Sequence, residues 1–139
     1  MLNRRDLFET LLKKGAGAVL CASLAAAVSQ ASDDIPVFDQ ELPAVSLNNW
    51  TVRAFEVTYA PGESSTPHRH PGFVLGYVLE GAIRFALKGQ DEKSYRAGQM
   101  FYEPPGSVHF VSSNASATQR ARFLAMIFAE KGTPDTLPA

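Results

Sequence analysis

Short runs of apolar and β-branched residues alternate with turn-forming residues along most of the chain. The run WTVRAFEVTY at 50–59 has the composition that favours a strand, and it ends at the turn signal APG. The runs FVLGYVLEG and AIRFALKG follow, and Glu80-Gly81 predicts the turn between them. Further along, MFYEPPGSVHFVSS predicts a strand, a Pro-Pro-Gly turn and another strand.

The run ARFLAMIFA at 121–129 is apolar on both faces, so it fits either a central strand or a buried helix, and its flanking pattern favours the strand. About seven short strands separated by turns predict an all-β fold, a small sandwich or barrel. A chain of 139 residues has room for one domain.

The pattern divides the chain into four parts. Residues 1–31 are expected to form an export signal, and residues 32–49 an N-terminal arm in which Pro36 and Pro43 oppose regular structure. Residues 50–130 are expected to form the β-barrel domain, and residues 131–139 a C-terminal tail.

The leader begins with charged residues and continues into an apolar run of small residues at 15–28. This run is too short to cross a bilayer as a helix, and its length suits a signal peptide cleaved after Ala31. Arg4-Arg5 followed by Asp-Leu-Phe resembles a twin-arginine export signal, although an ordinary secretory signal or an uncleaved anchor also fits. We expect a periplasmic or secreted protein without a stable membrane anchor after cleavage.

Composition and charge exclude several kinds of site and partner. The single cysteine, Cys21, lies in the leader, so thiolate ligands, a cysteine nucleophile and disulfides are excluded for the mature chain. Leu20 before it is too large for a lipoprotein cleavage site. The net charge is −1, and the mature part is mildly acidic, so no nucleic-acid partner is expected. No serine-hydrolase, phosphate-loop or dinucleotide motif occurs.

The three histidines carry the candidate chemistry. His68 and His70 are two residues apart, so in a strand they project from the same face. His109 lies forty residues on, just after EPPG, and all three lie beside proline-glycine turns. Neutral imidazoles are ligands for zinc, iron, copper and nickel, so this group is a candidate metal site.

The spacing around these histidines resembles the two motifs of the cupin family. The first reads Gly62, five residues, His68-Arg69-His70, three residues, Val74, six residues and Gly81. The second reads Gly98, five residues, Pro104-Pro105-Gly106, two residues, His109 and Asn114. Every spacing of the first motif fits, but valine stands at 74 where the family has glutamate. The asparagine of the second motif comes one residue late. The resemblance covers residues 50–128.

The resemblance implies a double-stranded β-helix, a jelly-roll barrel, with one divalent transition metal (Fe, Zn, Mn, Ni or Cu) held at its mouth by His68, His70 and His109. Three interpretations of the missing glutamate follow. The site is an open three-histidine site, which we favour; or another oxygen ligand replaces it; or the site is vestigial. Glu103 is the acidic residue beside a histidine-bearing turn, and we expect it at the rim or behind the ligands rather than on the ion.

Strand alternation from His70 places Val74, Gly76 and Val78 inward and Tyr77 outward. Arg53 and Arg69 could meet a carboxylate, but we expect both at the surface.

The resemblance therefore implies an exported metal-binding cupin that acts on a small oxygenated organic molecule by dioxygenase, isomerase or lyase chemistry, with unassigned catalytic residues. If it is an enzyme, we expect a non-haem dioxygenase first. The alternatives are a non-catalytic cupin that binds or senses a metabolite or sugar, and a structural barrel. A homodimer is expected, because a small domain gains buried area that way.

Overall fold

Nine strands in two antiparallel sheets make up the computed structural model, which describes residues 34–139. The strands are β1 (Trp50–Tyr59), β2 (His68–Arg69), β3 (Phe73–Glu80), β4 (Ala82–Leu87), β5 (Lys93–Arg96), β6 (Met100–Glu103), β7 (Val108–Asn114), β8 (Ala121–Glu130) and β9 (Leu137–Pro138). Within 34–139 there is no α-helix, and hence none long and apolar enough to cross a membrane. The export signal expected at 1–31 lies outside the described residues.

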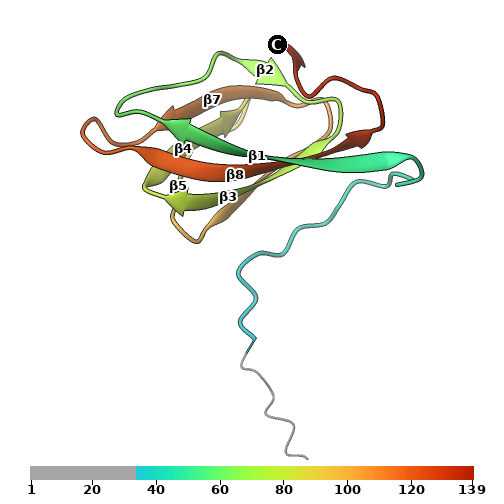
Figure 1. The fold of residues 1–139 in the computed structure, drawn as a ribbon, viewed down its shortest axis with the longest axis horizontal. Coiled ribbons are helices and arrows are strands. Elements are labelled where there is room, and N and C mark those ends of the chain that lie inside the picture. The colour runs from blue at the N-terminus through green and yellow to red at the C-terminus, as the bar shows by residue number, and fades with distance from the viewer. Residues whose placement is uncertain (1–33) are drawn as a thin grey trace, which may run out of the picture. The chain divides into compact units, whose positions relative to one another are not determined.

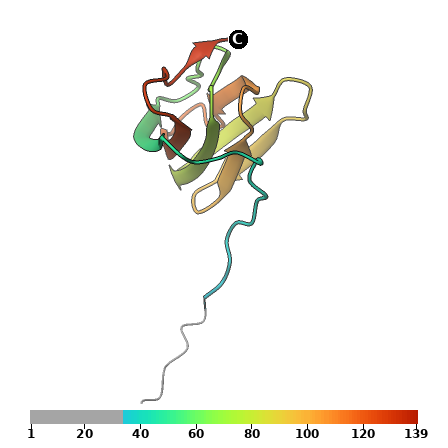
Figure 2. The same cartoon turned by 90° about the vertical axis from the view of Figure 1, so that its right-hand side faces the viewer.

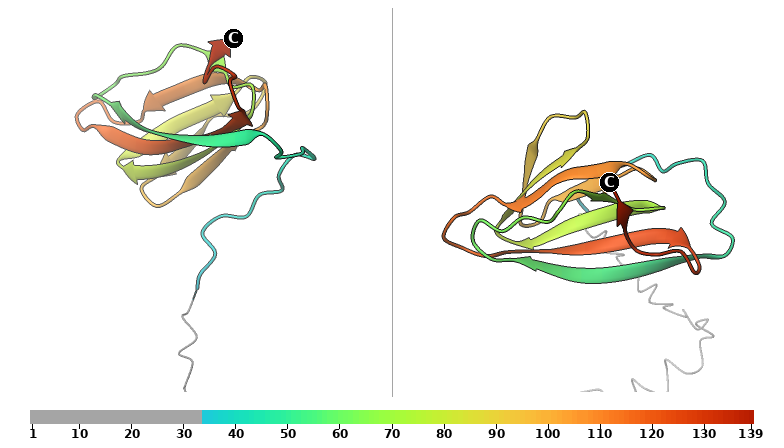
Figure 3. Two further views of the ribbon diagram at one scale, coloured as in Figure 1. Left: turned by 45° about the vertical axis from the view of Figure 1, so that its right-hand side comes forward. Right: turned by 90° about the horizontal axis from the view of Figure 1, so that it is seen from above.

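The strand order is β1-β8-β3-β6 in the first sheet and β5-β4-β7-β2-β9 in the second. In Figure 1, β1, β8 and β3 run side by side across the front. Figure 2 shows β1 and β8 on one side and the β4–β5 hairpin on the other. The right-hand view of Figure 3 shows the two sheets facing each other. This architecture confirms the all-β double-stranded β-helix, and the apolar run at 121–129 is a strand between two others, β8.

The space between the sheets is filled by apolar side chains from both. The main core cluster consists of Tyr59, Val78, Ile83, Phe85, Leu87, Phe101, Ala121 and Phe123. Gly76 lies opposite Phe101 in the β3–β6 register, and a Cβ atom at 76 would come within 2.1 Å of the Phe101 ring. The ring therefore occupies the place of a side chain. Val74 and Val78 are buried and Tyr77 is only half-buried, which confirms the predicted alternation of β3.

A β-bulge in β7 explains the late asparagine. Leu87 pairs with His109 and Ala86 with Val111, so Phe110 is left between them, 58% exposed. One extra residue reverses the alternation beyond it. His109 and Asn114 are therefore both buried, although they are five positions apart in sequence and would face opposite sides of a regular strand.

Asn114 ties the turn after β7 to the end of β1. Its Nδ2 donates hydrogen bonds to the carbonyls of Ala60 and Gln119 at 3.0 and 2.7 Å, and its Oδ1 accepts one from the Ser116 amide at 2.9 Å. A buried amide with these partners stabilises a unique loop conformation.

Both terminal segments were assigned by composition. Residues 131–139, expected as a C-terminal tail, include β9, which joins the second sheet, where Pro138 lies opposite His68 and Leu137 opposite Arg69. The pairing adds backbone hydrogen bonds to the two-residue strand β2, which otherwise pairs only with β7. Residues 35–49 contain no strand and expose several apolar side chains, as an arm does.

Candidate metal centre

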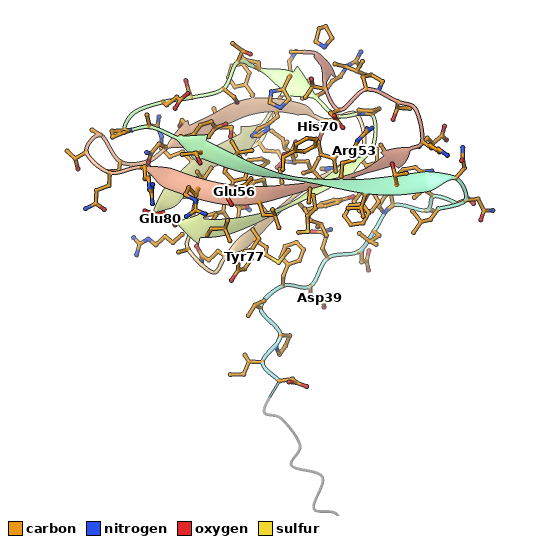
Figure 4. The ribbon with its side chains drawn as sticks, in the orientation of Figure 1. Asp39, Arg53, Glu56, His70, Tyr77 and Glu80 are labelled. Carbon is orange, nitrogen blue, oxygen red and sulfur yellow. The ribbon has the colours of Figure 1, made fainter. Side chains whose placement is uncertain are left out.

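Sheet pairing brings the three histidines together. His68 lies directly opposite His109 in the β2–β7 register, and His70 follows β2. One ring nitrogen of each histidine lies within 4.8 Å of the others. His70 and His109 are buried and His68 is half-buried. In Figure 4, His70 lies between the two sheets. The three side chains singled out in the sequence therefore converge at one point.

Backbone carbonyls fix the orientation of two of the rings. Nδ1 of His68 donates to the Thr66 carbonyl at 2.8 Å, and Nδ1 of His70 donates to the Asp135 carbonyl at 2.6 Å. A carbonyl oxygen can only accept, so each Nδ1 carries the proton and each Nε2 keeps its free lone pair. This arrangement is typical of metal-binding histidines, whose second nitrogen is held by an acceptor.

Glu103 is buried beside the histidines, so of the two positions expected for it, at the rim or behind the ligands, the exposed rim is the one that does not hold. Its side chain is buried, with Oε1 3.4 Å from Nδ1 of His109 and Oε2 3.9 Å from Nε2 of His70. The reason is strand parity: Phe101 in the core fixes the inward face of β6, and Glu103 is two residues further on. Met100 and Tyr102 occupy the other face and are half-buried.

Burial controls the ionisation of these groups. It raises the pKa of Glu103 to about 8 and, together with the nearby rings of His68 and His70, lowers the pKa of His109 to about 3. The pKa of His70 is also lowered, mainly by burial. At neutral pH the metal-free site therefore holds neutral rings at His70 and His109 and a protonated carboxyl at Glu103.

The residues present fit a divalent transition metal. Oε2 of Glu103 and both ring nitrogens of His109 are buried without a hydrogen-bond partner among the described residues. Buried polar atoms without a partner cost free energy, and a bound cation would satisfy one ring nitrogen of His109 and the Glu103 oxygen. Three neutral imidazoles beside a carboxylate are a donor set that such ions accept.

The histidines open onto a cavity of about 490 Å³ between the sheets. Its apolar wall comes from β1, β3 and β8, and consists of Phe55, Val57, Val74, Phe123, Ala125 and Ile127. Its polar end holds the three histidines and Glu103, with Ser112 and Thr136 nearby. The cavity therefore has the size and character of a small-molecule site with one polar end.

Several contributors to the site were not found from the sequence. The carbonyls of Thr66 and Asp135 carry no side-chain signal, so no sequence pattern identifies them. Arg53, expected at the surface, is half-buried and pairs with Asp135 through Nε at 2.5 Å. Arg69 is exposed, as expected.

Comparisons with known proteins agree with this geometry. The family model described as the cupin domain matches residues 55–127. Germin-like protein subfamily T member 3 of Arabidopsis thaliana is 33% identical over 102 residues, which are 67% of this chain and 44% of the relative. Germin-like protein 1-1 of Oryza sativa subsp. japonica is 37% identical over 76 residues, 51% of this chain and 34% of the relative. The chain thus spans less than half the length of these relatives.

Solved structures share the fold. A cupin-like protein from Thermotoga maritima superposes with a TM-score of 0.56 at 18% identity, covering 63% of this chain and 64% of that one. The DMSP lyase DddQ from Ruegeria pomeroyi DSS-3 gives 0.54 at 15% identity, covering 76% and 59%. A variant of Bacillus subtilis oxalate decarboxylase gives 0.54 at 22% identity, covering 63% and 24%.

Proposed function

The chain belongs to the cupin family, and on this premise we propose that it binds one divalent transition-metal ion and acts on a small oxygenated organic molecule. The ligands in this proposal are Nε2 of His68 and His70 and a ring nitrogen of His109. The observation that carries it is the convergence of these three rings, two of which are held with Nε2 free. The identity of the metal is open, since imidazole accepts several ions.

In this proposal, Glu103 supplies the negative charge that balances the metal ion. Three neutral histidines leave a divalent ion with its full charge, and Val74 has no group to offset it. Glu103 is the acidic side chain that lies among the histidines, 3.4 Å from one ring and 3.9 Å from another. Its carboxylate therefore compensates the charge of the ion.

The cavity supports a small substrate that has an oxygen-bearing end and an apolar body. A divalent ion at the polar end would supply Lewis-acid polarisation of a substrate oxygen. The apolar wall of β1 and β8 contacts the rest of the molecule and excludes water. Glu103 lies on the cavity wall beside the histidines, where it can accept a proton from the substrate. Proton transfer of this kind favours lyase or isomerase chemistry over dioxygenation.

Two of the solved structures with this fold are named for lyase and decarboxylase activities, on DMSP and oxalate. At 15% and 22% identity they share only the fold with this chain. They are examples of enzymes built on this fold, and in that sense they favour an enzyme over a purely structural barrel.

Metal analysis tests the proposal first. Protein purified after expression in medium supplemented with iron, zinc, manganese and nickel should contain about one ion per chain, and a His68→Ala/His109→Ala double variant should contain little. Equal metal content in the two proteins, or none in either, overturns the metal site and leaves the non-catalytic binder.

Activity is then sought with the metal-loaded protein. A panel of small carboxylates, hydroxy acids and diketones, followed by NMR, should reveal turnover that the double variant lacks. Oxygen uptake during turnover would contradict the lyase or isomerase assignment and indicate a dioxygenase. If the protein binds compounds of this panel but converts none of them, the result contradicts an enzyme and favours a sensor.

We also propose that residues 1–31 direct export by the twin-arginine route. The support is the Arg4-Arg5 pair before a short apolar run. In cells that express the full chain, fractionation should find the processed protein outside the cytoplasm, and Arg4→Lys/Arg5→Lys should retain the protein inside. Unchanged export of that variant contradicts the route.

A further inference from the structure

We infer that Arg53 and Asp135 position the metal ligand His70, by holding the C-terminal strap (residues 131–138) against the mouth of the cavity. The inference rests on the proposed function for its metal readout only, because the orientation of the His70 ring can be measured without metal.

Arg53 makes two contacts with the strap from the opposite sheet. Arg53 belongs to β1 in the first sheet, whereas the strap ends in β9 of the second. Its Nε pairs with the Asp135 carboxylate at 2.5 Å, and one terminal nitrogen donates to the Thr133 carbonyl at 2.9 Å. The contact with Asp135 is a close ion pair without hydrogen-bond geometry, whereas the hydrogen bond to the Thr133 carbonyl is directional, so the guanidinium holds the strap at two points.

The strap in turn contacts both neighbouring histidines. The Asp135 carbonyl accepts the hydrogen bond from Nδ1 of His70 at 2.6 Å. Two residues later β9 begins, and Pro138 lies opposite His68 in the β2–β9 register. Asp135 and Thr136 also line the cavity. The residue that Arg53 holds through its side chain is therefore the same residue that orients His70 through its backbone.

The start of the strap is held separately. The Lys131 amide donates to the Asn49 carbonyl at 2.8 Å, and Oγ1 of Thr133 donates to the Glu130 carbonyl at 2.7 Å. Loss of the Arg53 contacts should thus free the middle of the strap without detaching its start. Arg53 and His70 lie at the same end of the barrel, where the strap crosses (Figure 4).

A positioning role is distinguishable here from a general contribution to stability. The Arg53 and Asp135 side chains are 35% and 39% exposed, and ion pairs at such positions contribute little to folding. The hydrogen bond to His70, by contrast, is part-buried and involves a ring that is itself buried. Removal of groups that orient a metal ligand typically weakens metal binding by about 10–100-fold.

The experiment compares Arg53→Met with Arg122→Met. Arg122 is a matched control, because it lies on the neighbouring strand β8, pairs with Glu56 at 2.7 Å and Glu80 at 3.4 Å, and does not itself line the cavity. Figure 4 labels both of these glutamates. Two quantities are measured on the full mature chain: the dissociation constant for Co²⁺, by optical titration, and the ¹⁵N shifts of the His70 ring in metal-free protein.

Arg53→Met should raise the dissociation constant for Co²⁺ about 10–100-fold and should move the His70 ¹⁵N shifts away from a single Nδ1–H tautomer. Arg53→Lys should recover part of both effects, and Arg122→Met should show neither. If Arg53→Met does not fold, Asp135→Asn serves instead, since it keeps the carbonyl that His70 uses and removes the charge that Arg53 holds.

Wild-type Co²⁺ affinity and wild-type His70 shifts in the folded Arg53 or Asp135 variant overturn the inference. If wild-type protein itself binds no Co²⁺, the proposed function fails, while the ¹⁵N comparison still decides whether Arg53 orients the ring.

Discussion

Val74 and Glu103 lie directly opposite each other on β3 and β6, and both side chains are buried. Directly opposed residues on antiparallel strands have Cβ atoms about 4.5–5.5 Å apart. A carboxylate therefore lies one strand away from the position where the cupin pattern has glutamate, and it faces the same cavity. In the proposed function, Glu103 takes over from this neighbouring strand the part of a glutamate at 74.

Exchange of the two residues tests this relationship. Glu103→Val should weaken metal binding by about 10–100-fold, because it leaves three neutral histidines beside a divalent ion. The double variant Val74→Glu/Glu103→Val returns a carboxylate to the family position and should recover affinity to within about tenfold of wild type. Isothermal titration with Mn²⁺ or Co²⁺ measures both.

Val74→Glu alone is the control, since it places two carboxylates side by side in a buried site and should destabilise the metal-free protein. Wild-type affinity in Glu103→Val, or a double variant as weak as the single one, contradicts the idea that Glu103 takes over the role of a glutamate at 74.

The stability of the metal-free protein should depend on pH through Glu103 and His109. The fold raises the pKa of Glu103 from 4.5 to about 8, so from pH 4.5 upward the unfolded chain loses a proton that the fold keeps, and stability falls as pH rises to 8. The fold lowers the pKa of His109 from 6.5 to about 3, so stability falls as pH drops below 6.5. His70 acts in the same direction as His109.

The slopes of Glu103 and His109 oppose each other between pH 4.5 and 6.5, and His70 adds to the acid side. We expect the free energy of unfolding to be highest near pH 6.5, to fall gently toward pH 4.5 and more steeply below it, and to decline above pH 6.5. Each pKa unit corresponds to roughly 1.4 kcal/mol at most. Urea unfolding in EDTA at several pH values measures the profile. Glu103→Gln should abolish the alkaline decline, and saturating metal should suppress it, because the bound cation favours the ionised carboxylate. An alkaline decline that persists in Glu103→Gln shows that another group is responsible.

Much of the fold was accessible from the sequence, because alternation and turn residues act locally. β1 has the bounds predicted from WTVRAFEVTY, and the inward face of β3 follows from counting in twos from His70. The three histidines were predictable because the spacing of two motifs fixes them. Long-range pairing was not accessible: β9 joins β2, and Arg53 meets Asp135, through contacts that no local pattern encodes.

Glu103 is an intermediate case. The parity of β6 decides whether it faces the site, and the neighbouring Pro-Pro-Gly turn obscures that parity in the sequence. Phe101 in MFYE was the available signal, since a core phenylalanine two residues before Glu103 puts both on the inner face. The carbonyls of Thr66 and Asp135 are beyond any sequence signal, because every residue has one.

A homodimer is predicted through the outer face of the first sheet. One row of paired residues crosses all four strands on this face: Ala54, Met126, Leu75 and Tyr102. All four are apolar or aromatic, and none is fully buried: Ala54 is exposed, and the other three are half-buried. β8 is therefore apolar on both faces, one of which fills the barrel.

Met126→Lys places a charge in the middle of that row and should convert the dimer to a monomer, measured by light scattering at working concentration. Phe110→Lys is the control, because it replaces an exposed apolar residue on the other sheet and should leave the dimer unchanged. A monomeric wild-type protein, or a dimeric Met126→Lys variant that retains wild-type affinity, excludes this interface.

The bulge at Phe110 predicts that this residue can be deleted. Without it, Val111 follows His109 directly, and the pairs His109–Leu87 and Val111–Ala86 are retained with regular spacing. Asn114 then stands at the family spacing from His109, and its buried hydrogen bonds to the turns after β1 and β7 are kept. The variant should fold with a melting temperature within a few degrees of wild type and with unchanged Co²⁺ affinity.

Deletion of Arg84, which lies in the regular part of β4, is the control: it moves Ile83 or Phe85 to the wrong face and should prevent folding. Thermal unfolding followed by circular dichroism separates the two, and a ΔPhe110 variant as unstable as the Arg84 deletion would mean that the bulge itself is required.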